Sequence, residues 1–292
     1  MSQNPFSSGK LARGFSVPIF AIVVLSSLGI TLLAFYLVVP EWLWVAQISA
    51  SWKAIVVTFL AVNLHNCFLE YFFHRYVLHK TVIQFFRAFY KAHHLIHHPL
   101  TRIKKKRVRD GREILVLVEN DYPFTRPEQN ESSIFPWYTF FAFVLVLTPL
   151  FALLQWLMPA LPWFLVGYCG LAWSLTLYEG FHYIEHLPLE KWLPLIDHPR
   201  FGEFWTKVYG FHLFHHAETG SNEAISGFFL FPLADKVFRT LETPKTLFPT
   251  GEKWDQTNFW KSNPVWLIRW LDEWVKKVES KRRNKSRVKI AA

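Results

Sequence analysis

The sequence predicts an all-α integral membrane protein in which four transmembrane helices support a cytoplasmic helical cap. Four long apolar runs occur in a chain of 292 residues that is 51% hydrophobic and 18% aromatic. Each run can cross a hydrocarbon core of ~30 Å at ~1.5 Å of rise per helical residue. Ten of the thirteen histidines also gather in four short boxes, each next to the end of a predicted span. This pattern predicts a membrane bundle with its functional side chains at one end.

The first two spans are predicted at about residues 15–39 and 53–73, after a flexible polar N-terminus at residues 1–13. They open the main domain, which we place at residues 14–242. The apolar stretch of the first span is too long for the core of a cleavable signal peptide.

The second span contains a row of polar residues. Asn63, Asn66, Glu70 and His74 are separated by three, four and four residues, so they share one face of a helix. Polar groups at membrane depth are costly unless they face the interior of the bundle. The row therefore either bonds to neighbouring helices or faces a metal site, where Glu70 would orient His74.

The third and fourth spans are predicted at about residues 134–157 and 163–181, joined by a tight turn at residues 158–162. Cys67 and Cys169 both fall within predicted spans. They form neither a CxxC metal pair nor an expected disulfide, so packing is their expected role.

A polar region at residues 79–133 separates the second and third spans. Asp110-Gly111 lies between a basic run and the apolar segment 114–118, which is typical of a β-hairpin. We therefore expect a small hairpin within residues 101–120. Its basic side chains either lie in solvent or bind phosphate headgroups.

The C-terminal region, residues 243–292, predicts an amphipathic helix followed by a basic tail. Asn263 and Pro264 suit its N-cap and first position. Its apolar face repeats tryptophan at positions 266, 270 and 274. Tryptophan on a basic helix suits the bilayer interface, and docking on the protein's own cap is the alternative.

The distribution of Lys and Arg predicts the topology. The two short loops between spans contain none, whereas the region between the second and third spans contains eleven and the chain after His186 contains seventeen. By the positive-inside rule, both termini and all four boxes lie on the cytoplasmic side. Topology and anionic headgroups also account for the net charge of +10, so we expect no nucleic-acid partner.

The spacing within the boxes predicts metal ligation. Histidines three or four residues apart share a helical face, as in the two HxxHH triplets and the pair 182 and 186. His74 and His79 are five apart, about 140° on a regular helix, so they need a local distortion or two different ions. The predicted ligands are His74, His79, His94, His97, His98, His182, His186, His212, His215 and His216.

Ten imidazoles exceed what one ion can bind, so the sequence predicts a site with two ions. Imidazole suits Zn, Cu, Fe and Ni equally, so ligand softness does not select the metal. The membrane location and an apolar substrate favour iron with molecular oxygen, with zinc as a possible substitute. We predict no catalytic residue beyond the ligands.

Residues 64–242 resemble the fatty acid hydroxylase superfamily, which includes fatty acid hydroxylases, sterol desaturases and sphingolipid hydroxylases. The matching motifs are HRYVLH (74–79), HHLIHH (93–98), HYIEH (182–186) and HLFHH (212–216). Asn222 and the DKVF segment at Asp235 resemble elements that follow the last box of the family. His93 matches a doubled histidine whose first member is usually not a ligand, so it is left out of the ligand set.

The resemblance implies a multi-pass membrane oxidoreductase with a dinuclear iron site that uses oxygen to hydroxylate or desaturate a fatty acyl chain, sterol or sphingolipid. Two electrons would come from an external cytochrome b5-like or ferredoxin-like donor with its reductase. The chain has no HPGG haem loop of its own. We assign supporting roles beside the ligands to Glu70, Glu179, Glu185 and Asn222.

A different class of function remains open. A membrane protein that binds or transports metal without oxygenase chemistry would also collect histidines, but it would place ligands at mid-membrane. Because the boxes lie at the cytoplasmic boundary, we expect the enzyme. We also expect its lipid to arrive sideways from the bilayer, with the reacting carbon near the headgroup end.

Overall fold

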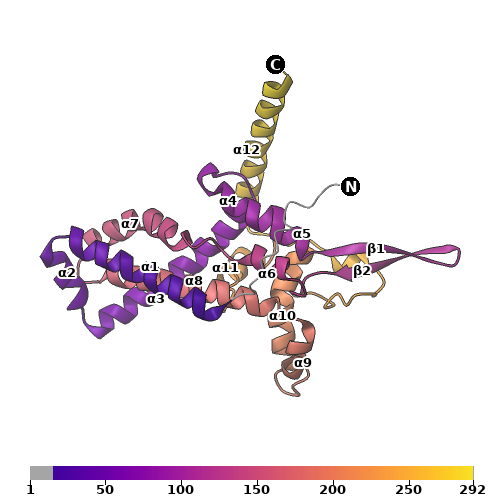
Figure 1. The fold of residues 1–292 in the computed structure, drawn as a ribbon, viewed down its shortest axis with the longest axis horizontal. Helices are drawn as coiled ribbons and strands as arrows, with labels where there is room; N and C mark the ends of the chain where they lie inside the picture. The colour runs from indigo at the N-terminus through magenta and orange to yellow at the C-terminus, as the bar shows by residue number, and fades with distance from the viewer. Residues whose placement is uncertain (1–15, 292) are drawn as a thin grey trace.

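The computed structural model describes residues 16–291, so the N-terminus predicted at residues 1–13 lies outside the described part of the chain. Figure 1 shows an elongated molecule with long helices at one end and a two-stranded hairpin at the other. The helices at the first end are α1 (Val17–Val38), α2 (Glu41–Ile48), α3 (Trp52–Phe73), α7 (Thr139–Leu157) and α8 (Trp163–Glu185).

Helix α8 is the centre of this bundle, because α1, α3 and α7 all pack against it. It approaches α3 closely at Gly170, where a Cβ atom would lie 2.6 Å from the side chain of Val62. Asn66 strengthens the same contact by donating from Nδ2 to the hydroxyl of Ser174 (3.0 Å). This close approach fixes α8 relative to the helix that leads to His74.

The two short loops meet at the far end of the bundle. Gln47 of α2 donates from Nε2 to Oε1 of Gln155 (3.0 Å), near the end of α7. Its own Oε1 accepts from the backbone N–H of Phe164 (3.0 Å), at the start of α8. Both loops therefore lie at the same end, opposite the histidine boxes.

Three helices are long and apolar enough to cross a membrane, namely Pro18–Val38, Trp52–Leu78 and Thr139–Leu157. Among the described residues α8 is not one of them, although a fourth span was predicted at 163–181. The absence of α8 from the candidate spans fits its position at the centre of the bundle. Thirteen of its 23 residues are buried, whereas only 22%, 33% and 28% of the three apolar windows are buried. A helix covered by other helices needs fewer lipid-compatible side chains.

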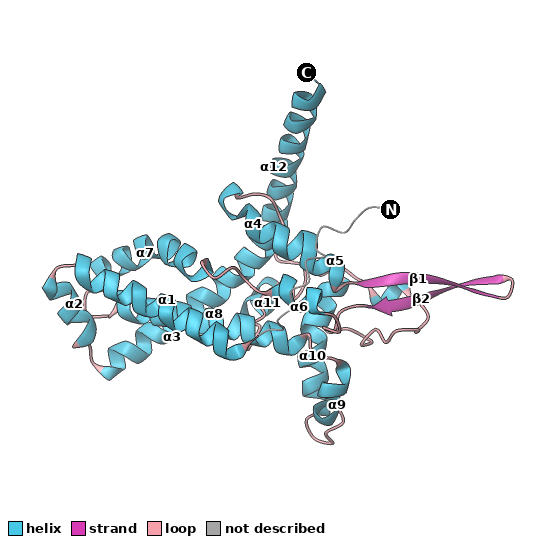
Figure 2. Cartoon of the chain, viewed as in Figure 1, coloured by secondary structure: helices cyan, strands magenta, loops and turns pink. Residues whose placement is uncertain are grey.

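The predicted hairpin is confirmed. Strand β1 (Ile103–Asp110) pairs antiparallel with β2 (Glu113–Asn120), and Asp110 lies opposite Glu113. Gly111 adopts φ +57° in the two-residue turn, a conformation that glycine adopts without strain. In Figure 2 the hairpin extends away from the helical bundle.

Short elements fill the middle of the molecule and carry most of the boxes. They are η1 (His74–Leu78), η2 (Gln84–Phe86), α4 (Arg87–Tyr90), η3 (Lys91–His97), α5 (His98–Leu100), α6 (Pro127–Ser133), α9 (Leu189–Ile196), α10 (Gly202–Ala217), α11 (Leu233–Phe238) and η4 (Gln256–Asn258). Leu213 and Phe214 of α10 are fully buried in a core with Tyr122 and Phe248. This core holds α10 and its histidines in place.

The C-terminal helix α12 (Trp266–Ala291) docks on the protein through one face. Ile268 and Val275 are buried, and Asp272 accepts from Arg75. Docking, one of the two alternatives, is therefore what the structure shows for this face. Trp270 and Trp274 remain about half exposed on another face. In Figure 1 the helix runs across the long axis of the bundle.

Candidate metal centre

Two groups of five buried histidines lie in the middle of the molecule. The first cluster is His74, His79, His93, His98 and His215, and the second cluster is His97, His182, His186, His212 and His216. Within each cluster, one ligand atom per residue lies within 4.8 Å of all the others. Nine of the ten predicted ligands belong to these clusters.

The first cluster is built on two π-helical segments, η1 and η3. In η1 the backbone N–H of His79 donates to the carbonyl of His74, five residues earlier (3.2 Å). In η3 the N–H of His98 donates in the same way to the carbonyl of His93. Hydrogen bonds from i to i+5 widen the turn, so residues five apart come to share a face. This is the local distortion that the spacing of His74 and His79 required.

Because of the π-helical turn in η3, His93 lies in the first cluster and the predicted ligand His94 does not. His93, which was left out, lies inside the first cluster with Nε2 2.9 Å from Nε2 of His74. His94, which was predicted as a ligand, is half-buried outside both clusters and contacts His79 through Nδ1 (3.0 Å). On a regular helix His94 would pair with His98, four residues later. The wider turn pairs His98 with His93 instead.

The second cluster rests on regular α-helices. His182 and His186 are four residues apart at the end of α8, and His212 and His216 have the same spacing at the end of α10. Nε2 of His212 lies 3.1 Å from Nε2 of His186 and 3.0 Å from Nε2 of His216. The i, i+4 rule therefore places these four side chains on common faces.

Each cluster takes its fifth histidine from the other half of the chain. His215 of α10 joins the first cluster, and His97 of η3 joins the second. The clusters are also neighbours, since the rings of His98 and His216 stack with centroids 4.3 Å apart and planes 15° apart. Two ions held here would form one dinuclear centre.

The nitrogen atoms fit metal ions. Nε2 of several histidines converge on each other, with Nε2 to Nε2 distances of 2.9–3.1 Å. Two imidazole nitrogens at ~2.1 Å from one ion and at right angles to each other are separated by roughly 3 Å. Both ring nitrogens of His97 and Nε2 of His182 are buried without a hydrogen-bond partner among the described residues. An ion would satisfy Nε2 of His182 and one of the two nitrogens of His97.

The outward nitrogens are held by the protein. Nδ1 of His186 donates to the carbonyl of Tyr122 (2.8 Å), and Nδ1 of His215 donates to that of Ser221 (2.8 Å). These bonds fix the tautomer that leaves Nε2 as the free ligand atom. Burial lowers the pKa of His97 and His212 well below the usual value, so both are neutral and able to bind metal at pH 7.

No protein-family model matches the chain, and neither a curated protein nor a solved structure matches it. The site is therefore interpreted from its own geometry. Two buried five-histidine clusters that could hold metal ions lie in a mostly helical protein with three candidate membrane spans.

Sequence reasoning missed the group that holds His74. Its Nδ1 donates to the backbone carbonyl of Glu223 (2.6 Å), and the Glu223 carboxylate accepts from Arg75 (3.1 Å). Arg75 also donates twice to Asp272 of α12, at 3.0 and 2.7 Å. Asp235, noted only for its place in the DKVF segment, accepts from the backbone N–H of Glu223 (2.9 Å). The available signal was Arg75 itself, a charged residue within an apolar helix.

Three of the four supporting residues bond to backbone groups outside the clusters, and Glu185 has no partner among the described residues. Glu70 accepts from the backbone N–H of Ser226 (2.8 Å) rather than from His74. Glu179 accepts from the N–H of Phe135 (2.9 Å), and Asn222 bonds the backbone of residues 211 and 242. Both carboxylate oxygens of Glu185 are buried without a partner among the described residues. None of the four hydrogen-bonds to a cluster histidine within the described chain.

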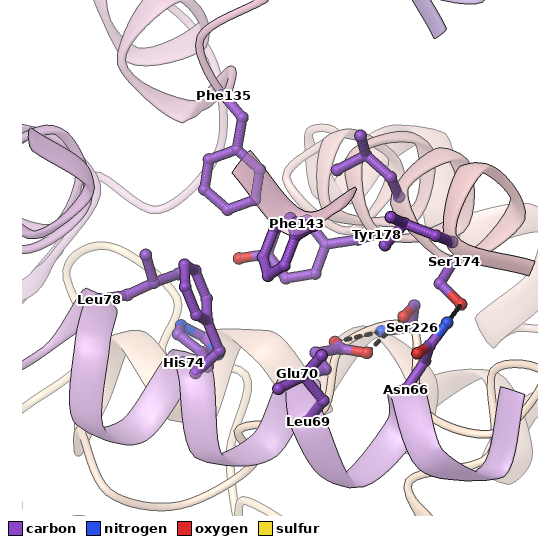
Figure 3. A pocket seen from close by; sticks show the side chains of 13 residues that line it. Asn66, Leu69, Glu70, His74, Leu78, Phe135, Phe143, Ser174, Tyr178 and Ser226 are labelled. Atoms are coloured by element: carbon purple, nitrogen blue, oxygen red, sulfur yellow. Dashed lines mark hydrogen bonds between the residues drawn. The ribbon is translucent and has the colours of Figure 1, made fainter. Parts of the chain in front are cut away.

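Two cavities reach the first cluster from different sides. An apolar cavity between α3, α7 and α8 has His74 in its wall (Figure 3) and is lined by Asn66, Leu69, Glu70, Phe73, His74, Leu78, Phe135, Phe143, Leu171, Ser174, Leu175, Tyr178 and Ser226. A polar cavity has His79 and His94 in its wall, together with Arg75, Lys80 and Lys261. The centre thus adjoins an apolar space and a polar, basic one.

Proposed function

We propose that the protein is an oxygen-dependent membrane oxidoreductase that hydroxylates or desaturates a lipid at a dinuclear iron site. The observation that carries the proposal is the apolar cavity that meets His74 beside two adjoining histidine clusters. A metal store or transporter has no use for an apolar space of this kind at its ligands. The resemblance of the four boxes to the fatty acid hydroxylase superfamily supports the same conclusion.

Iron is the metal proposed, with zinc as an inert substitute. Imidazole ligands accommodate both, and the choice of iron follows from chemistry at a lipid C–H bond. Hydroxylation inserts one oxygen atom of O₂ into that bond, and the other leaves as water after two electrons and two protons are supplied. Bound iron supplies the activation of oxygen, which no amino-acid side chain provides.

The protein's own residues hold and shield the reactants. The five histidines of each cluster hold one ion, and the backbone carbonyls of Glu223, Ser221 and Tyr122 keep three of the rings oriented. The apolar cavity, walled by Phe73, Phe135 and Phe143, excludes water and accepts the lipid. A dry, shaped site protects a reactive oxidant from side reactions.

We place α8 in the membrane as the fourth span. It starts beside Gln47 at the far end of the bundle and ends at the clusters, so its 23 residues run through the bundle in the direction opposite to α7. With four spans both termini lie on one side. The bias of Lys and Arg makes that side the cytoplasm.

An external electron donor is part of the proposal, because each hydroxylation or desaturation with O₂ consumes two electrons. The polar cavity is a suitable place for it. Lys80 and Lys261 line that cavity next to His94, which contacts the cluster residue His79. A cytochrome b5-like or ferredoxin-like protein with an acidic face fits this basic surface.

The test combines metal analysis with lipid mass spectrometry. Purified protein should contain two iron equivalents per chain, and membranes that express it should contain lipids with one added oxygen or two fewer hydrogens. His186→Ala should remove metal and product together. His198→Ala, at an exposed histidine outside both clusters, is the matched control and should change neither. Metal that crosses vesicle membranes without any lipid change would establish transport instead.

A further inference from the structure

Tyr178 of α8 presents a hydroxyl group with no protein partner. The residue is only 6% exposed, and its hydroxyl oxygen is buried without a hydrogen bond among the described residues. Phe135 stacks on its ring, with centroids 5.1 Å apart and planes 7° apart. Figure 3 shows the ring in the apolar cavity, with the hydroxyl directed to the side on which His74 and Leu78 lie. The side chain is held in place while its polar atom remains free.

The other polar side chains around the cavity already have partners. Glu70 accepts from Ser226 and Gly227, and Asn66 donates to Ser174. Nδ1 of His74 donates to Glu223. A buried hydroxyl without a partner costs roughly 1–3 kcal/mol, and native proteins keep few such groups. The Tyr178 hydroxyl therefore offers an occupant of the cavity a hydrogen-bond donor at a defined place.

The Tyr178 side chain lies next to both clusters. The Tyr178 ring centroid lies 6.4 Å from that of His74, in the first cluster, and 5.6 Å from that of His182, in the second. Leu69, Leu171 and Leu175 continue the cavity on the bundle side with apolar side chains. An occupant with an oxygen atom at Tyr178 would thus extend its hydrocarbon part into the bundle.

We propose that Tyr178 is a positioning residue that donates a hydrogen bond to an oxygen atom of the lipid substrate. The substrate class is then a lipid whose reacting carbon lies close to a hydroxyl, carbonyl or carboxyl oxygen, and not a plain stretch of hydrocarbon. This inference rests on the proposed function, because it names the substrate class of that same site. The O–H group of a tyrosine donates one hydrogen bond, which an oxygen atom of the lipid can accept.

The test measures binding, under nitrogen so that no turnover occurs. Unlabelled dodecan-1-ol and dodecane compete with radiolabelled dodecan-1-ol for the purified full-length protein in detergent. Wild type should prefer the alcohol roughly tenfold, which corresponds to ~1.4 kcal/mol. Tyr178→Phe keeps the ring and its stacking but should bring this ratio close to one. Iron content should stay unchanged.

Tyr168→Phe is the matched control. Tyr168 is also a buried tyrosine of α8, but its hydroxyl is already bonded to Thr148 (3.0 Å), away from the clusters. This variant should keep the tenfold preference. A wild type without preference for the alcohol, or an unchanged preference in Tyr178→Phe, overturns the inference.

The same variants separate this inference from the proposed function. If the preference depends on Tyr178 but no oxidised lipid forms in air, the positioning role stands and the oxygenase proposal fails. If oxidised lipid forms and Tyr178→Phe alters neither KM nor the carbon that is attacked, the oxygenase proposal stands and the positioning role fails. An increased KM or a shifted position of attack supports both.

Discussion

At the scale of single residues, the main structural result is that His93 belongs to the first cluster and His94 does not. His93 lies within the first cluster, with its Nε2 near those of His74 and His98. His94 is half-buried outside the cluster, and its Nδ1 contacts Nδ1 of His79 at the edge of the cluster. The two neighbours therefore occupy different places relative to the first cluster, although both belong to the same sequence motif.

We expect His93→Ala to reduce the metal content from two equivalents towards one, because it removes one of the five nitrogens of the first cluster. His94→Ala should keep two equivalents, since the cluster stays complete. Metal analysis of the two purified variants, after dialysis against a weak chelator, makes the comparison. Loss of metal in His94→Ala with full retention in His93→Ala would restore the assignment made from sequence.

Acid should remove the ions only well below pH 6.5. Protons compete with metal for imidazole nitrogen, and occupancy by protons rises as the pH falls. Burial lowers the pKa of His79, His97 and His216 well below the ordinary value for histidine, so protons compete little with metal at pH 6.5 and above. Equilibrium dialysis from pH 7.5 to 4.5 with metal analysis gives the profile. Half-release at pH 6.5, as for exposed imidazoles, would contradict the buried clusters.

At the scale of elements, α12 is coupled to the metal centre through a short chain of contacts. Asp272 of α12 binds Arg75, Arg75 binds Glu223, and the Glu223 carbonyl accepts from His74. The Arg75 side chain is 8% exposed and that of Asp272 25%. Solvent screens this pair only partly, so it contributes more than an open surface pair.

Asp272→Ala should lower stability by roughly 1–3 kcal/mol, because it leaves buried Arg75 with fewer partners. It should also weaken metal binding at the first cluster. Thermal unfolding and the rate of proteolysis within α12 are the measurements. Glu273→Ala is the control on the same helix, since its pair with Lys276 is exposed and contributes little. Equal effects of the two substitutions would show that the contact with Arg75 is unimportant.

The elements show how much of the fold can be predicted from the sequence. Hydrophobic runs located the three candidate spans to within a few residues, and Asp110-Gly111 located the hairpin, because both signals are local. The fourth span differs because α8 is less apolar than the three candidate spans, which fits a central helix that its neighbours cover. His93 takes the place of His94 in the first cluster because of a π-helical turn. A prediction that assumes a regular helix of 3.6 residues per turn does not include such a turn. The partners of Glu70 and His74 lie about 150 residues away, beyond any local pattern.

At the scale of the whole molecule, the two short loops lie at one end of the bundle and the clusters at the other. Cysteine at Ala160, which is exposed in the turn between α7 and α8, should react with an impermeant maleimide only from the side opposite the cytoplasm. Cysteine at Arg109 of the hairpin should react only from the cytoplasmic side. Native Cys67 is buried and Cys169 partly so, which keeps the background low. Reaction of both positions from one side would refute the four-span arrangement.

Each cluster contains one histidine from the other half of the chain, and this determines when each cluster can be completed during synthesis. The ribosome completes residues 74–98 long before residue 215 exists, so the first cluster holds only four of its histidines during that time. The second cluster likewise contains His97, which is synthesised before the other four histidines of that cluster, those of α8 and α10. Neither ion can bind its full set until α10 has emerged and folded against η3. Neither cluster is therefore complete before α10 has been made, and a chain truncated before α10 would have a full set of five histidines for neither ion.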